Sequence, residues 1–137
     1  MNDSLTALLI YDQPHPLESL RAVLKDLNGL SVETCSVRTC EEARRMVRQT
    51  QPQLIFTDTS LPDGSWRDVV GMAEKASSPV DVIVVGAHQD IRLYVSVLEG
   101  GAFDFVLPPF EHQALHFVVE SARHDVRRRR QEHAAVA

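Results

Sequence analysis

The chain has 137 residues, of which 44% are hydrophobic and 24% charged, and its formal net charge is −5. This composition excludes a disordered chain, and the length is typical of one domain with its own core. The only cysteines, Cys35 and Cys40, belong to no metal-spaced cluster and indicate free thiols in a reducing compartment. Because the sequence has neither a signal-peptide pattern nor an apolar run of about 18 residues, we expect a cytoplasmic protein without a membrane segment.

Charge is distributed unevenly along the chain. Residues 1–122 contain 9 basic and 17 acidic side chains, whereas residues 123–137 contain 5 and 2. We therefore expect a domain over residues 1–122, followed by a basic extension of the last helix and a tail over residues 123–137. The arginines at 127–130 are typical of a solvated helix end, where cations complement the helix dipole. Nucleic-acid binding within this chain is the less favoured interpretation, because no helix-turn-helix follows them.

Five short apolar runs predict β-strands, at residues 5–11, 30–37, 54–57, 80–85 and 103–107. The third and fourth runs are almost continuously apolar. That pattern is typical of strands covered on both faces of a parallel sheet, so these two strands are expected at its centre.

The segments between the strands have helical periodicity. A first helix over 17–27 is expected to stop at Asn28-Gly29, and the pair Thr39 and Glu42 predicts a capped second helix that ends before Pro52. Three further helices are predicted, around residues 69–73, 91–98 and 115–122. The second of these ends at a Gly-Gly pair, and the third continues into the arginines.

Strands and helices thus alternate five times. This alternation predicts an α/β fold with a doubly wound, five-stranded parallel sheet, strand order 2-1-3-4-5, flavodoxin-like, with helices on both faces. In such a fold the functional site lies beyond the carboxyl ends of the strands.

Two acidic residues follow strands that are neighbours in this order. Asp12 follows the first strand and Asp58 the third, so their carboxylates should converge. Two close carboxylates form a site for a hard cation such as Mg²⁺, and a carboxylate so placed can act as a nucleophile toward phosphorus. The alternative is that both aspartates only cap the turns from strand to helix.

Two motifs resemble those of response regulator receiver domains. Residues 58–64 read DTSLPDG directly after an apolar strand, and residues 100–110 read GGAFDFVLPPF, similar to the last strand of that family and the Lys-Pro-Phe that closes it. The resemblance extends from about residue 5 to about residue 122. It also predicts a cis peptide bond before Pro109, since X-Pro bonds tolerate that isomer.

The resemblance implies a receiver module of a two-component phosphorelay. Asp58 would accept a phosphoryl group from a sensor histidine kinase or a phosphotransfer protein, and Mg²⁺ would be bound by Asp12, Asp58 and the backbone carbonyl of Ser60. The resemblance implies signal transduction rather than an enzyme, and it implies a homodimer through the fourth and fifth helices.

The sequence departs from the family pattern at three positions. Tyr11 stands where a first acid is usual, although a shifted register would place Gln13 at the missing acid; in both cases Mg²⁺ binding should be weak. Gly86 replaces the Thr or Ser that contacts the phosphoryl group, and Pro108 replaces the Lys that pairs with its charge. The aromatic switch position keeps an aromatic residue, Phe105, but without a hydroxyl at position 86 the coupling between the two is lost.

Two interpretations follow from these departures. The first is a receiver phosphorylated on Asp58 with a weakened or atypical readout. The second is a phosphate-independent pseudo-receiver that acts as a protein–protein interaction module.

Overall fold

The computed structural model describes residues 5–136. Its elements are, in chain order, β1 (Leu5–Ile10), α1 (Leu17–Leu24), β2 (Val32–Val37), α2 (Cys40–Thr50), β3 (Leu54–Asp58), β4 (Ser60–Leu61), β5 (Gly64–Ser65), α3 (Trp66–Glu74), β6 (Asp81–Val85), α4 (Ile91–Glu99), β7 (Asp104–Val106) and α5 (His112–Val136).

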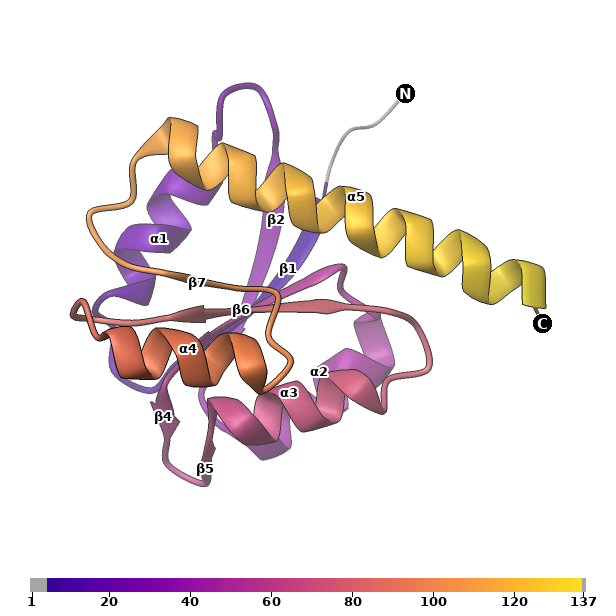
Figure 1. Cartoon of the computed structure of the whole chain (residues 1–137), viewed down its shortest axis with the longest axis horizontal. Helices are drawn as coiled ribbons and strands as arrows, with labels where there is room; N and C mark the ends of the chain where they lie inside the picture. Colours follow the sequence, from indigo (N-terminus) through magenta and orange to yellow (C-terminus); the bar gives the residue numbers. More distant parts are fainter. Residues whose placement is uncertain (1–4, 137) are drawn as a thin grey trace.

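The main sheet has five parallel strands in the order β2-β1-β3-β6-β7 (Figure 1). This order is the predicted 2-1-3-4-5, because β4 and β5 form only a small antiparallel hairpin outside the main sheet. The third and fourth predicted strands, β3 and β6, lie at the centre and next to it, as expected. The predicted α/β fold class is therefore confirmed.

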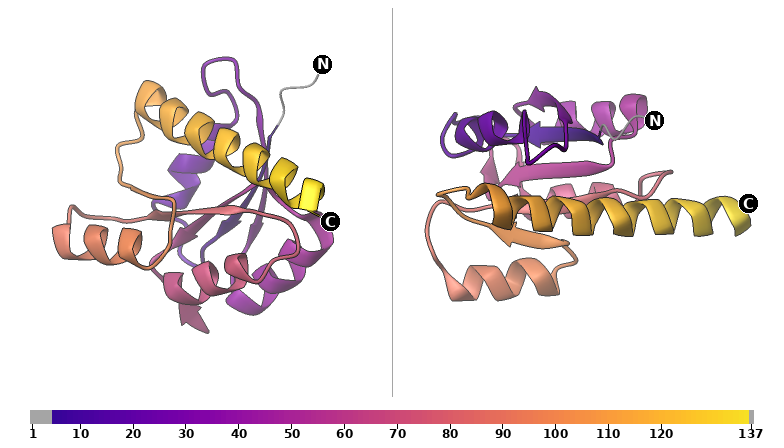
Figure 2. Two further views of the ribbon diagram at one scale, coloured as in Figure 1. Left: turned by 45° about the vertical axis from the view of Figure 1, so that its right-hand side comes forward. Right: turned by 90° about the horizontal axis from the view of Figure 1, so that it is seen from above.

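Two apolar cores lie on opposite faces of the sheet, and helices cover both faces (Figure 2). Alternate residues of the strands divide between them: Leu54 and Phe56 of β3 face the core under α1 and α5, whereas Ile55 faces the core under α2, α3 and α4. All three of these β3 side chains are fully buried. Helices thus cover both faces, as the continuous apolar runs predicted.

Helix boundaries follow the local signals in the sequence. Thr39 accepts a hydrogen bond from the backbone N–H of Glu42 at 3.1 Å and so caps α2. One predicted boundary is wrong: α1 ends at Leu24 and does not reach residue 27. Asn28 and Gly29, both with positive φ, instead form a tight turn between Leu27 and Leu30, whose backbones hydrogen-bond to each other. Ser65 and Asp68 form a capping box at the start of α3 that the sequence interpretation overlooked.

Helix α4 differs from expectation. An amphipathic helix in a globular domain usually buries its apolar face, but Ile91 is 72% exposed, Tyr94 and Val95 are each 43% exposed and Leu98 is 37% exposed. Only Val97 of this helix is buried. The amphipathic pattern was right for a helix, but periodicity alone did not show how much of its apolar face the sheet would cover.

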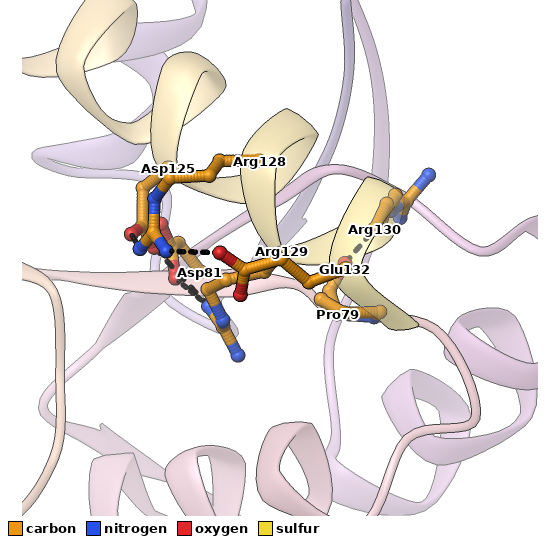
Figure 3. Close-up of polar contacts among 7 residues, drawn as sticks. All are labelled: Pro79, Asp81, Asp125, Arg128, Arg129, Arg130 and Glu132. Carbon is orange, nitrogen blue, oxygen red and sulfur yellow. Dashed lines mark hydrogen bonds and ion pairs between the residues drawn. The ribbon is translucent and has the colours of Figure 1, made fainter. Parts of the chain in front are cut away.

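Helix α5 continues without a break through the arginines and projects beyond the sheet (Figures 1 and 2). The prediction of a purely solvated helix end is wrong for two of them. Arg129 donates a hydrogen bond to Asp81 Oδ1 at 2.6 Å, and Arg130 donates to the carbonyls of Pro79, Gln51 and Pro52 at 2.9, 3.1 and 3.0 Å. Figure 3 shows the contacts with Asp81 and Pro79.

The buried Asp81 shares Arg129 with Asp125 of α5 (Figure 3). Burial, and next the neighbouring Asp125, raises the pKa of Asp81 to about 7, while Arg129 opposes this shift. A carboxyl with a raised pKa stabilises the fold most at low pH, so this contribution is lost as the pH rises through about 7.

The contacts of Arg129 and Arg130 attach the basic extension to the amino ends of β6 and β3. The division at residue 122 stays a prediction.

We predict that Arg130→Ala lowers the free energy of unfolding by about 1–3 kcal/mol, because it removes charge-assisted hydrogen bonds to three carbonyls. Urea denaturation followed by circular dichroism would measure the change. Arg127→Ala, which truncates an exposed arginine of the same helix, should change it by less than about 0.5 kcal/mol. Equal effects of the two substitutions would contradict an anchoring role for Arg130.

Candidate functional site

Asp58 is the last residue of β3 and pairs in register with Val85 of β6. Its carboxylate is partly buried and accepts hydrogen bonds from the backbone N–H of Thr59 at 2.7 Å and from the Thr59 hydroxyl at 3.4 Å. Burial raises the pKa of Asp58, and the two Thr59 bonds oppose that shift. Among residues 5–136, Asp58 forms no ion pair, so it is a partly desolvated carboxylate whose hydrogen bonds come from Thr59.

The loop after Asp58 is attached to α2. The exposed Asp63 accepts hydrogen bonds from the backbone N–H groups of Cys40 and Glu41 at 2.7 and 3.1 Å, at the amino end of that helix. These bonds lower the pKa of Asp63, the Cys40 bond first. Gly64 follows, and a Cβ there would lie 2.6 Å from Asp68 Oδ2, so a larger residue would displace the Asp68 side chain that caps α3. The sequence interpretation missed this cap, although Asp63 belongs to the motif it identified.

Asp12 lies just after β1, and its carboxylate has a cationic partner. Arg38, between β2 and α2, donates to Asp12 Oδ1 from Nε at 3.1 Å and from Nη2 at 2.9 Å. Gln13 also donates to the other carboxylate oxygen at 3.4 Å. Asp12 therefore shares no partner with Asp58 in the described part of the chain, and the convergence of the two carboxylates stays a prediction.

Tyr11 is buried, and its hydroxyl donates a hydrogen bond to Glu18 of α1. Gln13, the alternative position for the missing acid, is exposed. Neither Tyr11 nor Gln13, the two positions at which the family's other acid could align, supplies a second carboxylate beside Asp12. A pocket of about 380 Å³ has Tyr11, Asp12, Glu18 and Arg38 among its lining residues, and Asp58 does not line it.

Two carboxylates and the backbone carbonyl of Ser60 are oxygen donors of the kind that Mg²⁺ prefers. Among residues 5–136, however, no three His, Cys, Asp or Glu side chains are grouped to hold a metal ion. The predicted donors fit Mg²⁺ chemically, but Asp12 would have to exchange Arg38 for the ion. This competition is a physical reason for weak binding.

The structure explains why position 86 is a glycine, which the sequence did not show. A Cβ at this position would lie 2.5 Å from Cζ of Phe105 and 2.9 Å from Cδ2 of Leu107, so the phenyl ring fills the place of the missing side chain. Phe105 is buried and packs edge-on against Tyr94, with ring centroids 6.0 Å apart. His88, two residues further along the chain, is exposed. Position 86 thus lacks a hydroxyl, and it also lacks the space for one.

The segment after β7 contains Pro108 at the position of the expected lysine. The Pro108–Pro109 peptide bond is cis, which confirms that prediction. Because proline brings no charge, Pro108 supplies no cation to Asp58.

We predict that Asp58→Asn stabilises the fold at neutral pH by up to about 1 kcal/mol, after allowing for solvent screening, because it removes a partly desolvated charge. The gain should shrink as the pH falls through the pKa of Asp58, since the wild-type carboxyl is then neutral as well. Thermal unfolding between acid and neutral pH would measure it. Asp26→Asn, at an exposed site, should show no comparable gain, and destabilisation by Asp58→Asn would contradict the account.

We predict opposite signs for two alanine substitutions of glycine. Gly86→Ala should destabilise by about 1–3 kcal/mol, because its Cβ overlaps the Phe105 ring. Gly71→Ala, inside α3 with no atom within 4 Å of its Cβ, should stabilise by about 0.5–1 kcal/mol. Urea denaturation of both variants tests this, and a neutral Gly86→Ala would show that the ring does not occupy this space.

The chain is similar to known proteins over most of its length. The family model for the response regulator receiver domain matches residues 7–120. The transcriptional regulatory protein CitB of Klebsiella pneumoniae is 31% identical over 86% of this chain and 50% of its own length. The response regulator protein PilR of Pseudomonas aeruginosa is 30% identical over 85% of this chain and 25% of its own. The chain thus spans half or less of the length of these relatives.

Solved structures share the fold. A response regulator receiver domain protein from Clostridium thermocellum superposes with a TM-score of 0.74 and 20% identity, over 88% of this chain and 95% of that one. The beryllofluoride-activated NtrC4 receiver domain dimer superposes with a TM-score of 0.72 and 23% identity, over 88% and 98%. With the family model spanning nearly the whole sheet and its helices, the chain belongs to the response regulator receiver domain family.

Proposed function

We propose that this chain is a receiver module of a cytoplasmic two-component phosphorelay and accepts a phosphoryl group on Asp58. The donor would be a phosphohistidine of a sensor histidine kinase or a phosphotransfer protein. The observation that carries the proposal is the place of Asp58: a single carboxylate at the carboxyl end of the central strand, within the family's acceptor motif, and without a competing cation. No helix among residues 5–136 is long and apolar enough to span a membrane.

In the transfer, a carboxylate oxygen of Asp58 attacks phosphorus, the P–N bond to the donor histidine breaks, and the imidazole leaves. Asp12, Asp58 and the Ser60 carbonyl would hold Mg²⁺, which neutralises phosphoryl charge when bound. The Thr59 backbone N–H, 2.7 Å from Asp58 Oδ1, orients the carboxylate. Neither Gly86 nor Pro108 provides a general acid or base, so the module signals and does not act as an independent enzyme.

The readout of this phosphorylation is proposed to be weak. A switch requires contacts that favour one conformation over the other. A lysine contact is worth about 1.5–3 kcal/mol and a neutral hydroxyl about 0.5–1.5 kcal/mol, and both are missing here. Since Phe105 already occupies the space beside Gly86, phosphorylation cannot draw the ring into that position.

The same packing favours a second candidate function, a phosphate-independent pseudo-receiver. If Phe105 keeps one position, then the exposed apolar face of α4 has one fixed shape for a partner. Phe117 of α5 is 72% exposed as well. We propose α4 and α5 as the surface for a protein partner or a homodimer, whichever of the two functions holds.

The experiment is incubation of the protein with Mg²⁺ and acetyl phosphate, followed by intact-mass spectrometry and ¹H–¹⁵N amide spectra. We predict a mass increase of one phosphoryl group on Asp58, with amide shifts near Asp58 and Thr59 and little change at Tyr94 and Phe105.

Arg38→Gln should raise the Mg²⁺ affinity several-fold, because it frees Asp12 from its ion pair.

Asp58→Asn is the control, because it keeps the shape of the side chain and removes the nucleophile. If wild-type protein gains no mass under these conditions, the phosphoacceptor function is contradicted and the pseudo-receiver is favoured. Large shifts throughout α4 would contradict the weak readout instead.

A further inference from the structure

A cavity of about 380 Å³ lies between the last turns of α2 and α3 and the segment that leads into β6. The two helices lie side by side (Figure 1). Three buried apolar side chains line the cavity, Val47 of α2, Met72 of α3 and Val80 before β6. A concave, mostly apolar volume of this size is typical of small-molecule sites.

This cavity lies at the amino ends of the strands, whereas Asp58 lies at their carboxyl ends. Pro52 and Val80, which line it, precede the amino ends of β3 and β6, whereas Asp58 ends β3. The cavity therefore shares no residue with the proposed phosphoacceptor site, and what binds in it does not depend on the function proposed above.

The cavity has a cationic rim. Arg44 and Arg48 lie one turn apart on α2, and Lys75 follows α3. These three exposed side chains form no hydrogen bond or ion pair with another described residue. Three exposed cations that have no protein partner among the described residues thus lie around one apolar cavity.

We propose that this cavity binds an amphipathic organic anion. The apolar body would lie against Val47, Met72 and Val80, and the anionic head, a carboxylate or a similar group, would lie among Arg44, Arg48 and Lys75. Burial of the apolar body supplies affinity, and the cations select the charge of the head. The concave shape and the buried lining favour a small molecule over a flat protein surface.

The site adjoins the anchor of α5. Gln51 and Pro52 line the cavity, and their carbonyls accept the hydrogen bonds of Arg130. A molecule in the cavity thus lies against the residues that hold the basic extension in place.

The test is a titration of the full chain with decanoate, below its micelle concentration, followed by ¹H–¹⁵N amide spectra. We expect saturable shifts at the amides of Val47, Met72, Ser77 and Val80. Decyltrimethylammonium, with the same chain length and a cationic head, should produce none of them. The double variant Arg44→Gln/Arg48→Gln should weaken decanoate binding about tenfold, a loss typical of charge-assisted contacts.

Arg45→Gln is the matched control, because Arg45 is an exposed cation of the same helix that does not line the cavity. It should leave the affinity within about twofold of wild type. Absence of saturable shifts, equal binding of the cationic analogue, or an unchanged affinity of the double variant would overturn the proposal. Shifts of the same amides with rising protein concentration, without decanoate, would assign the cavity to a second copy of the chain and would also overturn it.

Discussion

Burial of β3 on both faces is the constraint on which the rest of the structure depends. Leu54, Ile55 and Phe56 are completely buried and alternate between the two cores, so this strand cannot slip by one residue without exchanging its faces. That register fixes where the chain leaves the apolar interior, and the residue at the exit is Asp58. The partial burial of its carboxylate, and hence its raised pKa, is a direct result of that position.

The charges around the edge of the sheet are balanced locally instead of at one shared site. Arg38 pairs with Asp12, Asp63 caps α2, and Asp58 retains only its bonds to Thr59. A receiver normally gathers several of these charges around one phosphoryl group. Here Phe105 and Leu107 pack against Gly86. Under the proposed function, Asp58 is the nucleophile, and this apolar packing stands where a group that responds to phosphate would lie.

The opposite edge of the sheet carries features of its own. Asp81 and the carbonyls near Pro52 and Pro79 hold Arg129 and Arg130, so a helix with a low intrinsic amphipathicity extends from the body in a fixed direction. Val126 of the same helix is buried in the core that lies under α1 and α5. The cationic cavity between α2 and α3 adjoins this anchor. The apolar core therefore positions polar groups at both ends of the strands. Only the groups at the carboxyl ends belong to the acceptor motif.

The sequence by itself determined the fold, because continuous apolar runs, three-and-four periodicity and a capping threonine are local signals. It also placed Asp58 and identified Gly86 and Pro108 as departures from the family. Only the tertiary structure decided what lies against these residues: the Phe105 ring at Gly86, Arg38 on Asp12, Asp63 on α2, and Arg130 on distant carbonyls. Apart from the Phe105 contact, these pairs join residues more than 20 positions apart. Their partners are set by how strands and helices pack and by which side chains remain uncovered, and neither is encoded in the periodicity of a single segment.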